Sequence, residues 1–228
     1  MSLARRQFLA SAAALGASRV LGQVPGRKED AVAVPARAVT KGPKHHFFGY
    51  YDKIPWDSTG RYLLAMEVDF IDRQPKPGEE LTVGMVDLQD GDKYLPLDKT
   101  AAWCWQQGTM LQWLGSAPDK EVIYNSVDDG AGIAVIRNVH TGKTRTLPRA
   151  VYAVSADGKK AVGLDFARLH RLRPGYGYAS LTEKFANEPA PDKLGIWNID
   201  PSTGKNELVV TLKQLAGHKP DARFDGAE

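Results

Sequence analysis

Short runs in which apolar and polar residues alternate make up most of the chain after residue 44. A period of two is typical of β-strands with one buried face, and turn residues separate the runs roughly every 8 to 15 positions. No stretch keeps the 3.6-residue period of an amphipathic helix long enough to predict a major helix. The pattern therefore predicts an all-β body.

One unit recurs three times within this body. It begins with a turn rich in Asp, Ser or Gly, followed by a basic residue and an apolar strand, at Trp56–Leu64, Ser116–Ile123 and Ser155–Val162. It continues with a second hairpin, which turns at Asp90–Gly91, Thr141–Lys143 and Thr203–Lys205. The Asp-Gly and Thr-Gly-Lys sequences supply the positive φ angle that tight hairpins need. Each unit is therefore predicted to contain four antiparallel strands.

Successive four-stranded units are typical of β-propeller blades. We expect blades at about 44–98, 101–148 and 150–211, and the start of a fourth blade in 212–228. An unrelated β-sandwich of about 12 strands is the alternative, although sandwiches do not usually repeat a turn and a hairpin in register. Because propellers close with about four to eight blades, this partial β-propeller indicates a fragment of a longer product or a ring completed by another subunit.

The N-terminal segment differs in character from the body. Residues 1–22 contain Arg5-Arg6-Gln7-Phe8-Leu9 followed by small residues, which resembles a bacterial twin-arginine export signal. The apolar run from Phe8 to Gly16 is too short for a bilayer span of about 20 residues, so no stable membrane span is expected. A cytoplasmic amphipathic helix is the alternative. We expect export by the twin-arginine machinery to a periplasmic or secreted location, with 23–43 as a linker.

Composition and charge narrow the classes of partner. The chain is 43% apolar and 25% charged, as in ordinary globular proteins. Three of its 30 basic residues lie in 1–22, and without them basic and acidic residues balance at 27 each. A neutral body argues against nucleic acid as a partner, since that binding needs a positive surface. The single Cys104 excludes an internal disulfide.

The segment from Asp165 to Lys193 is the least generic part of the sequence. It contains Arg168, His170, Arg171, Arg173, Tyr176 and Tyr178, with no acidic residue between Asp165 and Glu183. Arginine can hold a carboxylate or sulfate through paired hydrogen bonds, so the segment is a candidate anion site. The alternative is a structural cap in which the arginines bond to backbone carbonyls.

Propeller topology places several distant loops on one face. The connections between blades and the loops between the second and third strands share that face, which brings His45, His46, Trp105 and Gln106 toward the Asp165–Lys193 segment. Adjacent histidines on a strand point to opposite sides, so at most one of His45 and His46 faces a given pocket. No metal site is predicted within the chain, because further ligands at suitable geometry are missing from the pattern.

Three segments carry a resemblance to a known family: HHFFGYYDKIPWDSTGRYLLAMEVDFIDR, WQQGTMLQWL and LDFARLHRLRPGYGY. They are similar to exported seven-bladed β-propeller proteins related to the oligogalacturonate and ulvan polysaccharide lyases, and SADGKKAV resembles the repeat turn of TolB-like propellers. The resemblance covers roughly residues 44 to 212, about half of a full propeller. It implies an exported protein that binds or cleaves uronate-containing polysaccharide.

The chemistry of such a lyase suggests roles for individual residues as hypotheses. β-Elimination needs a group on the uronate carboxylate, a base for the C5 proton and an acid for the leaving oxygen. On this interpretation Arg168 or Arg173 binds the carboxylate, His170 or His46 is the base, and Tyr176 or Tyr178 is the acid. The other residues expected to contact substrate are Arg171, His45, Trp105 and Gln106.

The resemblance leaves the cofactor open. The metal-binding histidines of oligogalacturonate lyases belong to later blades, so a divalent metal is expected only in blades outside this sequence. The expected partner is an acidic oligosaccharide or polysaccharide. Two alternatives remain: a non-catalytic propeller that binds a glycan or an envelope protein, and an inactive fragment of a longer propeller.

Overall fold

The computed structural model describes residues 34–218. Contacts divide the chain after Arg37, and the description below concerns the unit that begins at Ala38. The expected signal in 1–22 and the last ten residues, 219–228, lie outside the described residues.

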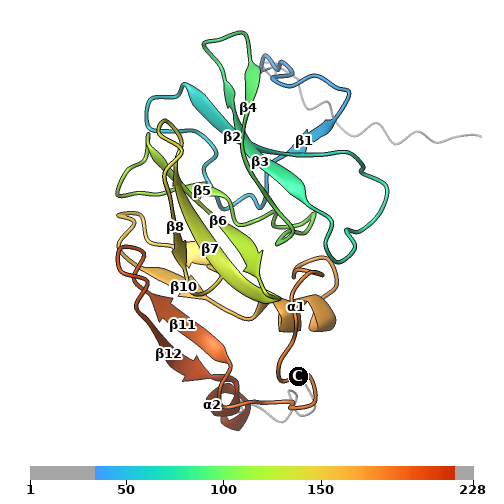
Figure 1. Ribbon diagram of the computed structural model, residues 1–228, viewed down its shortest axis with the longest axis vertical. Coiled ribbons are helices and arrows are strands. Elements are labelled where there is room, and N and C mark those ends of the chain that lie inside the picture. The colour runs from blue at the N-terminus through green and yellow to red at the C-terminus, as the bar shows by residue number, and fades with distance from the viewer. Residues whose placement is uncertain (1–33, 219–228) are drawn as a thin grey trace, which may run out of the picture. The chain divides into compact units, whose positions relative to one another are not determined.

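Three four-stranded antiparallel sheets follow one another along the chain (Figure 1). The first contains β1 (His45–Phe47), β2 (Tyr62–Val68), β3 (Leu81–Asp87) and β4 (Lys93–Thr100). The second contains β5 (Gln112–Trp113), β6 (Glu121–Asp128), β7 (Ala131–Asn138) and β8 (Thr144–Leu147). The third contains β9 (Ala153–Val154), β10 (Ala161–Gly163), β11 (Gly195–Ile199) and β12 (Asn206–Thr211).

Within each sheet the strands lie side by side in sequence order. This meander, repeated three times, is the architecture of propeller blades, so the predicted all-β fold with a partial propeller is confirmed. We refer to the three sheets as the first, second and third blades.

The hydrophobic core consists of separate clusters that lie between neighbouring blades. Strand alternation sends Leu64 and Met66 of the first blade toward Val122 and Tyr124 of the second, and all four are buried in one cluster. A second cluster joins the facing sides of the second and third blades and contains Ile123, Ile136, Ala161 and Ile199. Each blade therefore buries its apolar residues against its neighbour, which is what the repeated period-two pattern requires.

The repeated turns also contact one another. The Ser58 N–H donates to the carbonyl of Pro118 at 3.2 Å, which joins the turn of the first blade to that of the second. Gly158 of the third blade has a φ of 70°, and a Cβ there would lie 2.5 Å from Ser116 N. Glycine is needed at this close approach because a side chain would collide with the preceding turn.

Asn125 on β6 links all three blades. Its side chain is fully buried, accepts a hydrogen bond from Val151 N at 2.8 Å and donates to Val151 O at 2.8 Å. Its amide also donates to Tyr178 Oη at 3.0 Å. The Thr100 hydroxyl, at the end of the first blade, donates to the Asn125 carbonyl at 3.0 Å. A single position therefore satisfies buried polar groups of the first blade, of the connection between β8 and β9, and of the segment between β10 and β11.

Two short helices interrupt the strands. The first, α1 (Phe166–Leu172), lies within the segment that the sequence left as a loop. The second, α2 (Leu212–Gly217), begins where the start of a fourth blade was expected, so the first six residues of that stretch are helical. Thr211 and Gln214 form a capping box, with the Gln214 N–H donating to Thr211 Oγ1 at 3.0 Å. This Thr-x-x-Gln signal was present in the sequence.

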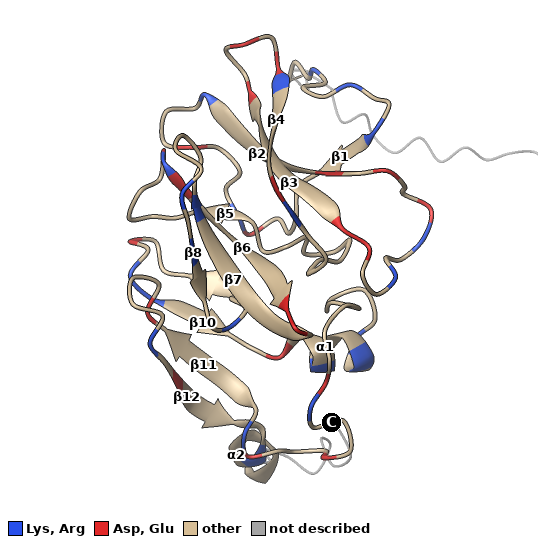
Figure 2. Cartoon of the chain, viewed as in Figure 1, with Lys and Arg blue, Asp and Glu red and all other residues tan. Residues whose placement is uncertain are grey.

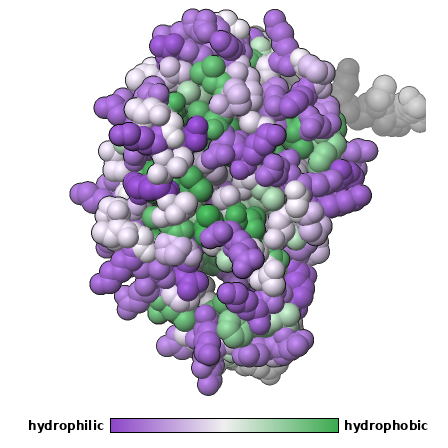
Figure 3. Space-filling view, in the orientation of Figure 1, coloured by the Kyte–Doolittle hydropathy of each residue, from purple (hydrophilic) through white to green (hydrophobic). Residues whose placement is uncertain are grey.

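The outward faces of the first and third blades differ. On the first blade the Tyr94 ring lies over Gly84, and its hydroxyl donates to the Thr82 carbonyl at 3.1 Å. On the third blade Val162 and Ile196 point away from the second blade and are each 40% exposed. In the view of Figure 3, hydrophobic residues reach the surface in small patches between hydrophilic ones. The outward face of the third blade therefore carries two partly exposed aliphatic side chains.

Removing the Asn125 amide should destabilise the whole unit. We expect Asn125→Ala to lower the free energy of unfolding by about 2 to 4 kcal/mol, since it leaves the buried Val151 N–H and carbonyl without partners. Urea unfolding of the 228-residue chain measures this loss. The exposed Gln106→Ala is the matched control, and equal stabilities for the two variants would refute the role given to Asn125.

The outward face of the third blade should drive self-association. We expect the chain to sediment as oligomers at increasing concentration, and Val162→Lys combined with Ile196→Lys to suppress them, because charge opposes apolar contact. Sedimentation velocity over a concentration series measures this. Ile71→Lys, at a residue 62% exposed on another loop, is the control. Monomeric behaviour of the unsubstituted chain at every concentration would contradict the expectation.

Candidate ligand-binding face

Several loops meet at one end of the blades, which we call the loop end. The 164–194 segment, which connects β10 to β11, contributes most of it. Gly78 N, in the loop between β2 and β3, donates to Ser180 Oγ of this segment at 3.0 Å. Thr182 N donates to Gly130 O, in the turn between β6 and β7, at 2.9 Å. Loops of all three blades are thus joined, as their topology predicts.

An aromatic stack holds the 164–194 segment on the third blade. The Asp165 side chain accepts a hydrogen bond from Arg168 N at 2.7 Å and so caps α1. The Phe166 ring stacks in parallel on that of Tyr178, with centroids 4.3 Å apart. Gly177 packs against α1 so closely that a Cβ would lie 2.1 Å from His170 N. The segment therefore folds back on its own helix.

Arg168 is committed to contacts within the protein. Its side chain is 8% exposed and pairs with Glu183 at 3.2 Å. Its guanidinium also donates to the carbonyls of Glu188, at 3.1 Å, and Pro189. These are the arginine-to-carbonyl bonds of the alternative interpretation. We therefore do not include Arg168 among the residues available to a ligand.

Glu183 neutralises much of the positive charge expected in this segment. Arg171 donates to both Glu183 oxygens, from Nε at 2.7 Å and from Nη2 at 3.0 Å. The hydrogen bonds from Arg171, together with the charge of Arg168, lower the pKa of Glu183 from its usual 4.5. Figure 2 shows the basic positions on α1. The sequence could not indicate this neutralisation, because Glu183 lies 12 residues beyond Arg171.

Tyr178 is also part of the interior. It is completely buried between Phe166 and Asn125, and burial raises its pKa well above the usual value. A ligand at the surface cannot reach this hydroxyl. Tyr178 anchors the segment, and the role of acid suggested for it by the chemistry of a lyase is left to Tyr176.

The two candidate bases lie in different blades. His46, on β1, is 8% exposed; its ring packs edge-on against Tyr94 at 4.7 Å, and its Nε2 is 3.2 Å from Glu67 Oε2. His45, its neighbour on β1, is half-buried. His170 is exposed in the last turn of α1. The structure records no hydrogen bond, ring contact or ion pair between His46 and His170, so it does not assemble them into one site.

Trp105 and Gln106 also take different positions. Trp105 is half-buried against Phe47, at 5.0 Å between centroids, and its Nε1 donates to Arg73 O at 2.7 Å. Gln106 is exposed, whereas the adjacent Gln107 is buried and donates to Tyr152 Oη at 2.9 Å. Cys104 is buried, and this raises the pKa of its thiol to about 11. Cys104 is thus an interior residue, and Trp105 packs against Phe47 with part of its side chain exposed.

Four exposed or half-buried residues form what we call the aromatic ridge: Tyr50, Tyr51, Arg173 and Tyr176. The rings of Tyr50 and Tyr51 lie 4.4 Å apart, and Tyr51 is 87% exposed. The Arg173 guanidinium lies 3.7 Å from the Tyr176 ring centroid.

The two pairs of the aromatic ridge lie within electrostatic reach of each other. Hydrogen bonding with Tyr51 raises the pKa of Tyr50, as do burial and Tyr176, while the Arg173 charge lowers it. No role for Tyr50 or Tyr51 was predicted from the sequence. Two adjacent aromatic residues beside Gly49 and Asp52, in a polar turn, were the available signal.

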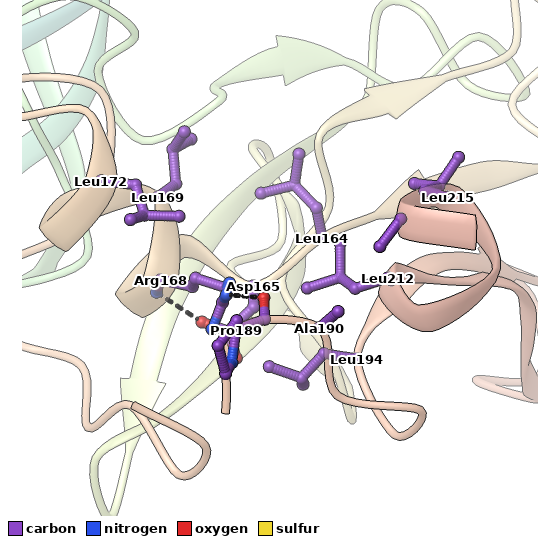
Figure 4. Close-up of a pocket in the computed structure, with 12 residues that line it drawn as sticks. Leu164, Asp165, Arg168, Leu169, Leu172, Pro189, Ala190, Leu194, Leu212 and Leu215 are labelled. Atoms are coloured by element: carbon purple, nitrogen blue, oxygen red, sulfur yellow. Dashed lines mark hydrogen bonds between the residues drawn. The ribbon is translucent and has the colours of Figure 1, made fainter. Parts of the chain in front are cut away.

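A separate apolar pocket of about 470 Å³ lies between α1, α2 and residues 189–194 (Figure 4). Aliphatic side chains dominate its lining: Leu164, Leu169, Leu172, Leu194, Leu212 and Leu215. Arg168 is its cationic lining residue, and its donors already have partners. The pocket thus offers hydrophobic contact but little polar chemistry.

Two features are absent from the described residues. Residues 34–218 contain no group of three or more His, Cys, Asp or Glu side chains placed to hold a metal ion. None of the helices in that range has the length and apolar character needed to cross a membrane.

Comparisons with known proteins give structural similarity only. No protein-family model and no curated protein matches the sequence. An oligogalacturonate lyase from Vibrio parahaemolyticus matches 75% of this chain over 42% of its own, at 12% identity and a TM-score of 0.48. For TolB from Acinetobacter baumannii the match covers 74% of this chain and 33% of TolB, at 10% identity and a TM-score of 0.41. For the AtxE2 isopeptidase the match covers 78% of this chain and 32% of the isopeptidase, at 12% identity and a TM-score of 0.42.

The chain spans less than half the length of each of these structures. The assignment of its fold rests on its own three four-stranded sheets.

Arg168 and Arg173 should differ in their effect on stability. We expect Arg168→Ala to lower the free energy of unfolding by about 3 kcal/mol, because it leaves buried carbonyls and part of Glu183 without a partner. The exposed Arg173→Ala is the control and should change it by less than about 0.5 kcal/mol. Urea unfolding at neutral pH measures both, and equal losses would contradict the structural role of Arg168.

The acid dependence of stability should follow Glu183. Because its pKa is lowered in the folded state, its ionised form stabilises the fold above the unfolded value, and this contribution disappears as the pH falls through the lower folded value. We expect Glu183→Gln to be less stable than the unsubstituted chain near pH 7, with a smaller difference near pH 3. Unfolding curves at both values measure this. A difference that does not depend on pH would refute it.

Proposed function

We propose that this chain is part of an exported β-propeller protein that binds an acidic oligosaccharide or polysaccharide at its loop end. The observation that carries the proposal is the aromatic ridge, which combines the Tyr50–Tyr51 ring pair of the first blade with the Arg173–Tyr176 pair of the third. The export part rests on Arg5-Arg6-Gln7-Phe8-Leu9 and includes the twin-arginine machinery as a partner.

The chemistry of the aromatic ridge suits a charged sugar. Tyrosine rings offer flat apolar faces for the C–H groups of a pyranose and a hydroxyl at the edge. The planar guanidinium of Arg173 matches a uronate carboxylate or a sulfate. Unlike Arg168, Arg173 donates no recorded side-chain hydrogen bond to the described residues, so its donors are available to a ligand.

Binding has more support than turnover. Of the residues implied for β-elimination, Arg168 and Tyr178 are used in the interior, and His46 lies beside Glu67 and Tyr94. His170, exposed three residues before Arg173, keeps a lyase as the second candidate. It would remove the C5 proton while Tyr176 protonates the leaving oxygen.

Titration with a galacturonate oligomer by calorimetry tests the proposal. We expect Arg173→Ala and Tyr51→Ala each to weaken binding about tenfold or more, as for loss of a charged hydrogen bond or a stacking face. Arg173→Lys should also lose affinity, because a point charge does not reproduce the planar fork. Lys159→Ala is the control, since it removes one charge from the turn between β9 and β10.

Three results would separate the possibilities. Equal affinities for the unsubstituted chain and the Arg173 and Tyr51 variants would overturn the binding site. Equal affinity for a neutral oligomer of the same length would overturn the preference for acid. Formation of an unsaturated uronate that absorbs in the ultraviolet, lost in His170→Gln with binding retained, would support the lyase.

A further inference from the structure

A polar cleft of about 290 Å³ opens between the second and third blades at the loop end. The turn between β6 and β7 and the residues after β8 form one wall, and the 164–194 segment forms the other. Its lining includes Gly130, Gly132, Arg149, Asp165, Lys184 and Lys193. We call it the cation cleft, and it shares no residue with the aromatic ridge.

The charges in this cleft are unbalanced. Arg149, Lys184 and Lys193 line it, whereas Asp165 is its single lining carboxylate. Asp165 is already engaged, because its Oδ1 accepts the hydrogen bond that caps α1. In the part of the chain that the structure describes, none of the three cations has an ion pair within 4.0 Å. Elsewhere on this segment, by contrast, both Arg168 and Arg171 are paired with Glu183.

Arg149 is held in place while most of its donors stay free. Its guanidinium stacks on Trp197, 3.2 Å from the ring centroid, and its Nε donates to Asn206 Oδ1 at 2.8 Å. Its terminal nitrogens have no hydrogen-bond acceptor among residues 34–218. Burial lowers the pKa of Arg149, and the charge of Asp165 opposes this shift. A half-buried cation without a direct ion-pair partner is costly unless an anion joins it.

Backbone contacts fix the walls of the cleft. Thr182 N donates to Gly130 O at 2.9 Å, and Ala150 N donates to Gly132 O at 3.0 Å. A Cβ at Gly163 would lie 2.4 Å from Ala150 O, so the close approach of β10 to the connection between β8 and β9 requires glycine. Backbone contacts between neighbouring segments therefore hold the walls of the cleft together, and Lys184 and Lys193 are exposed at its border.

We propose that the cation cleft binds a small oxyanion, namely a carboxylate, sulfate or phosphate group. The unpaired Nη groups of Arg149 provide the planar fork that such anions accept, and Lys184 and Lys193 add two mobile ammonium groups. A volume near the lower end of ligand pockets suits one charged group or one sugar rather than a long chain. The inference does not rest on the proposed function, because the anion can be a free ion or the charged group of a larger ligand.

Calorimetric titration of the 228-residue chain with sodium sulfate and sodium phosphate, at ionic strength held constant with sodium chloride, tests the proposal. We expect the Lys184→Gln and Lys193→Gln double variant to bind about tenfold more weakly or worse. Both lysines are exposed, so folding should be unaffected. Arg149→Lys keeps the charge but loses the fork, and it should also weaken binding. Lys159→Gln with Lys160→Gln is the control, because it removes the same charge from the turn between β9 and β10.

The outcomes separate this site from the aromatic ridge. Retained sulfate binding in Arg173→Ala supports the cleft even if that variant no longer binds a galacturonate oligomer. Competition between sulfate and the oligomer would assign the bound group to the oligosaccharide, and independent binding would assign it to a free ion; both support the site. Absence of binding by either anion, or equal binding by the lysine double variant and its control, would overturn the proposal.

Discussion

The pairing of Asn125 with Val151 is the contact on which the other parts of this structure depend. One amide satisfies a buried N–H and a buried carbonyl on the next blade, while its own backbone carbonyl receives the Thr100 hydroxyl from the preceding blade. Hydrophobic contact alone allows two packed sheets to slide relative to each other. The two hydrogen bonds between the Asn125 side chain and the Val151 backbone define one relative position. Because the same amide reaches Tyr178, the position of the 164–194 segment is set by the bond that sets the blade spacing.

The fold was largely predictable because its signals are local. Turn chemistry, the period of two and the in-register repeat each depend on a few neighbouring residues, and together they gave three antiparallel four-stranded units. The short helix α1 was missed because its seven residues give too little of a helical period to recognise. For α2 the capping box was visible at Thr211 and Gln214, but the repeat led us to expect the start of a fourth blade there.

The candidate site was less predictable because it depends on residues distant in sequence. The cluster of arginines is visible in the sequence. Only the folded structure shows that the Arg168 guanidinium pairs with Glu183 and donates to two backbone carbonyls. Nothing in the sequence distinguishes Arg149, which lies in the connection between β8 and β9. In the structure its guanidinium stacks on Trp197 and donates to Asn206, and two lysines line the same cleft. Which cations remain free is therefore a property of tertiary pairing, and the number of cations in a segment does not determine it.

The Tyr94 ring over Gly84 gives the stack of blades a direction. On the first blade the Tyr94 ring covers the outer surface of the strands, because Gly84 has no side chain and leaves room for it. The Tyr94 hydroxyl donates to the backbone carbonyl of Thr82 there. At the third blade the corresponding surface carries the partly exposed aliphatic side chains of Val162 and Ile196. Among the described residues, the face of the third blade that carries Val162 and Ile196 is thus better suited to pack against a further sheet than the Tyr94 face of the first blade.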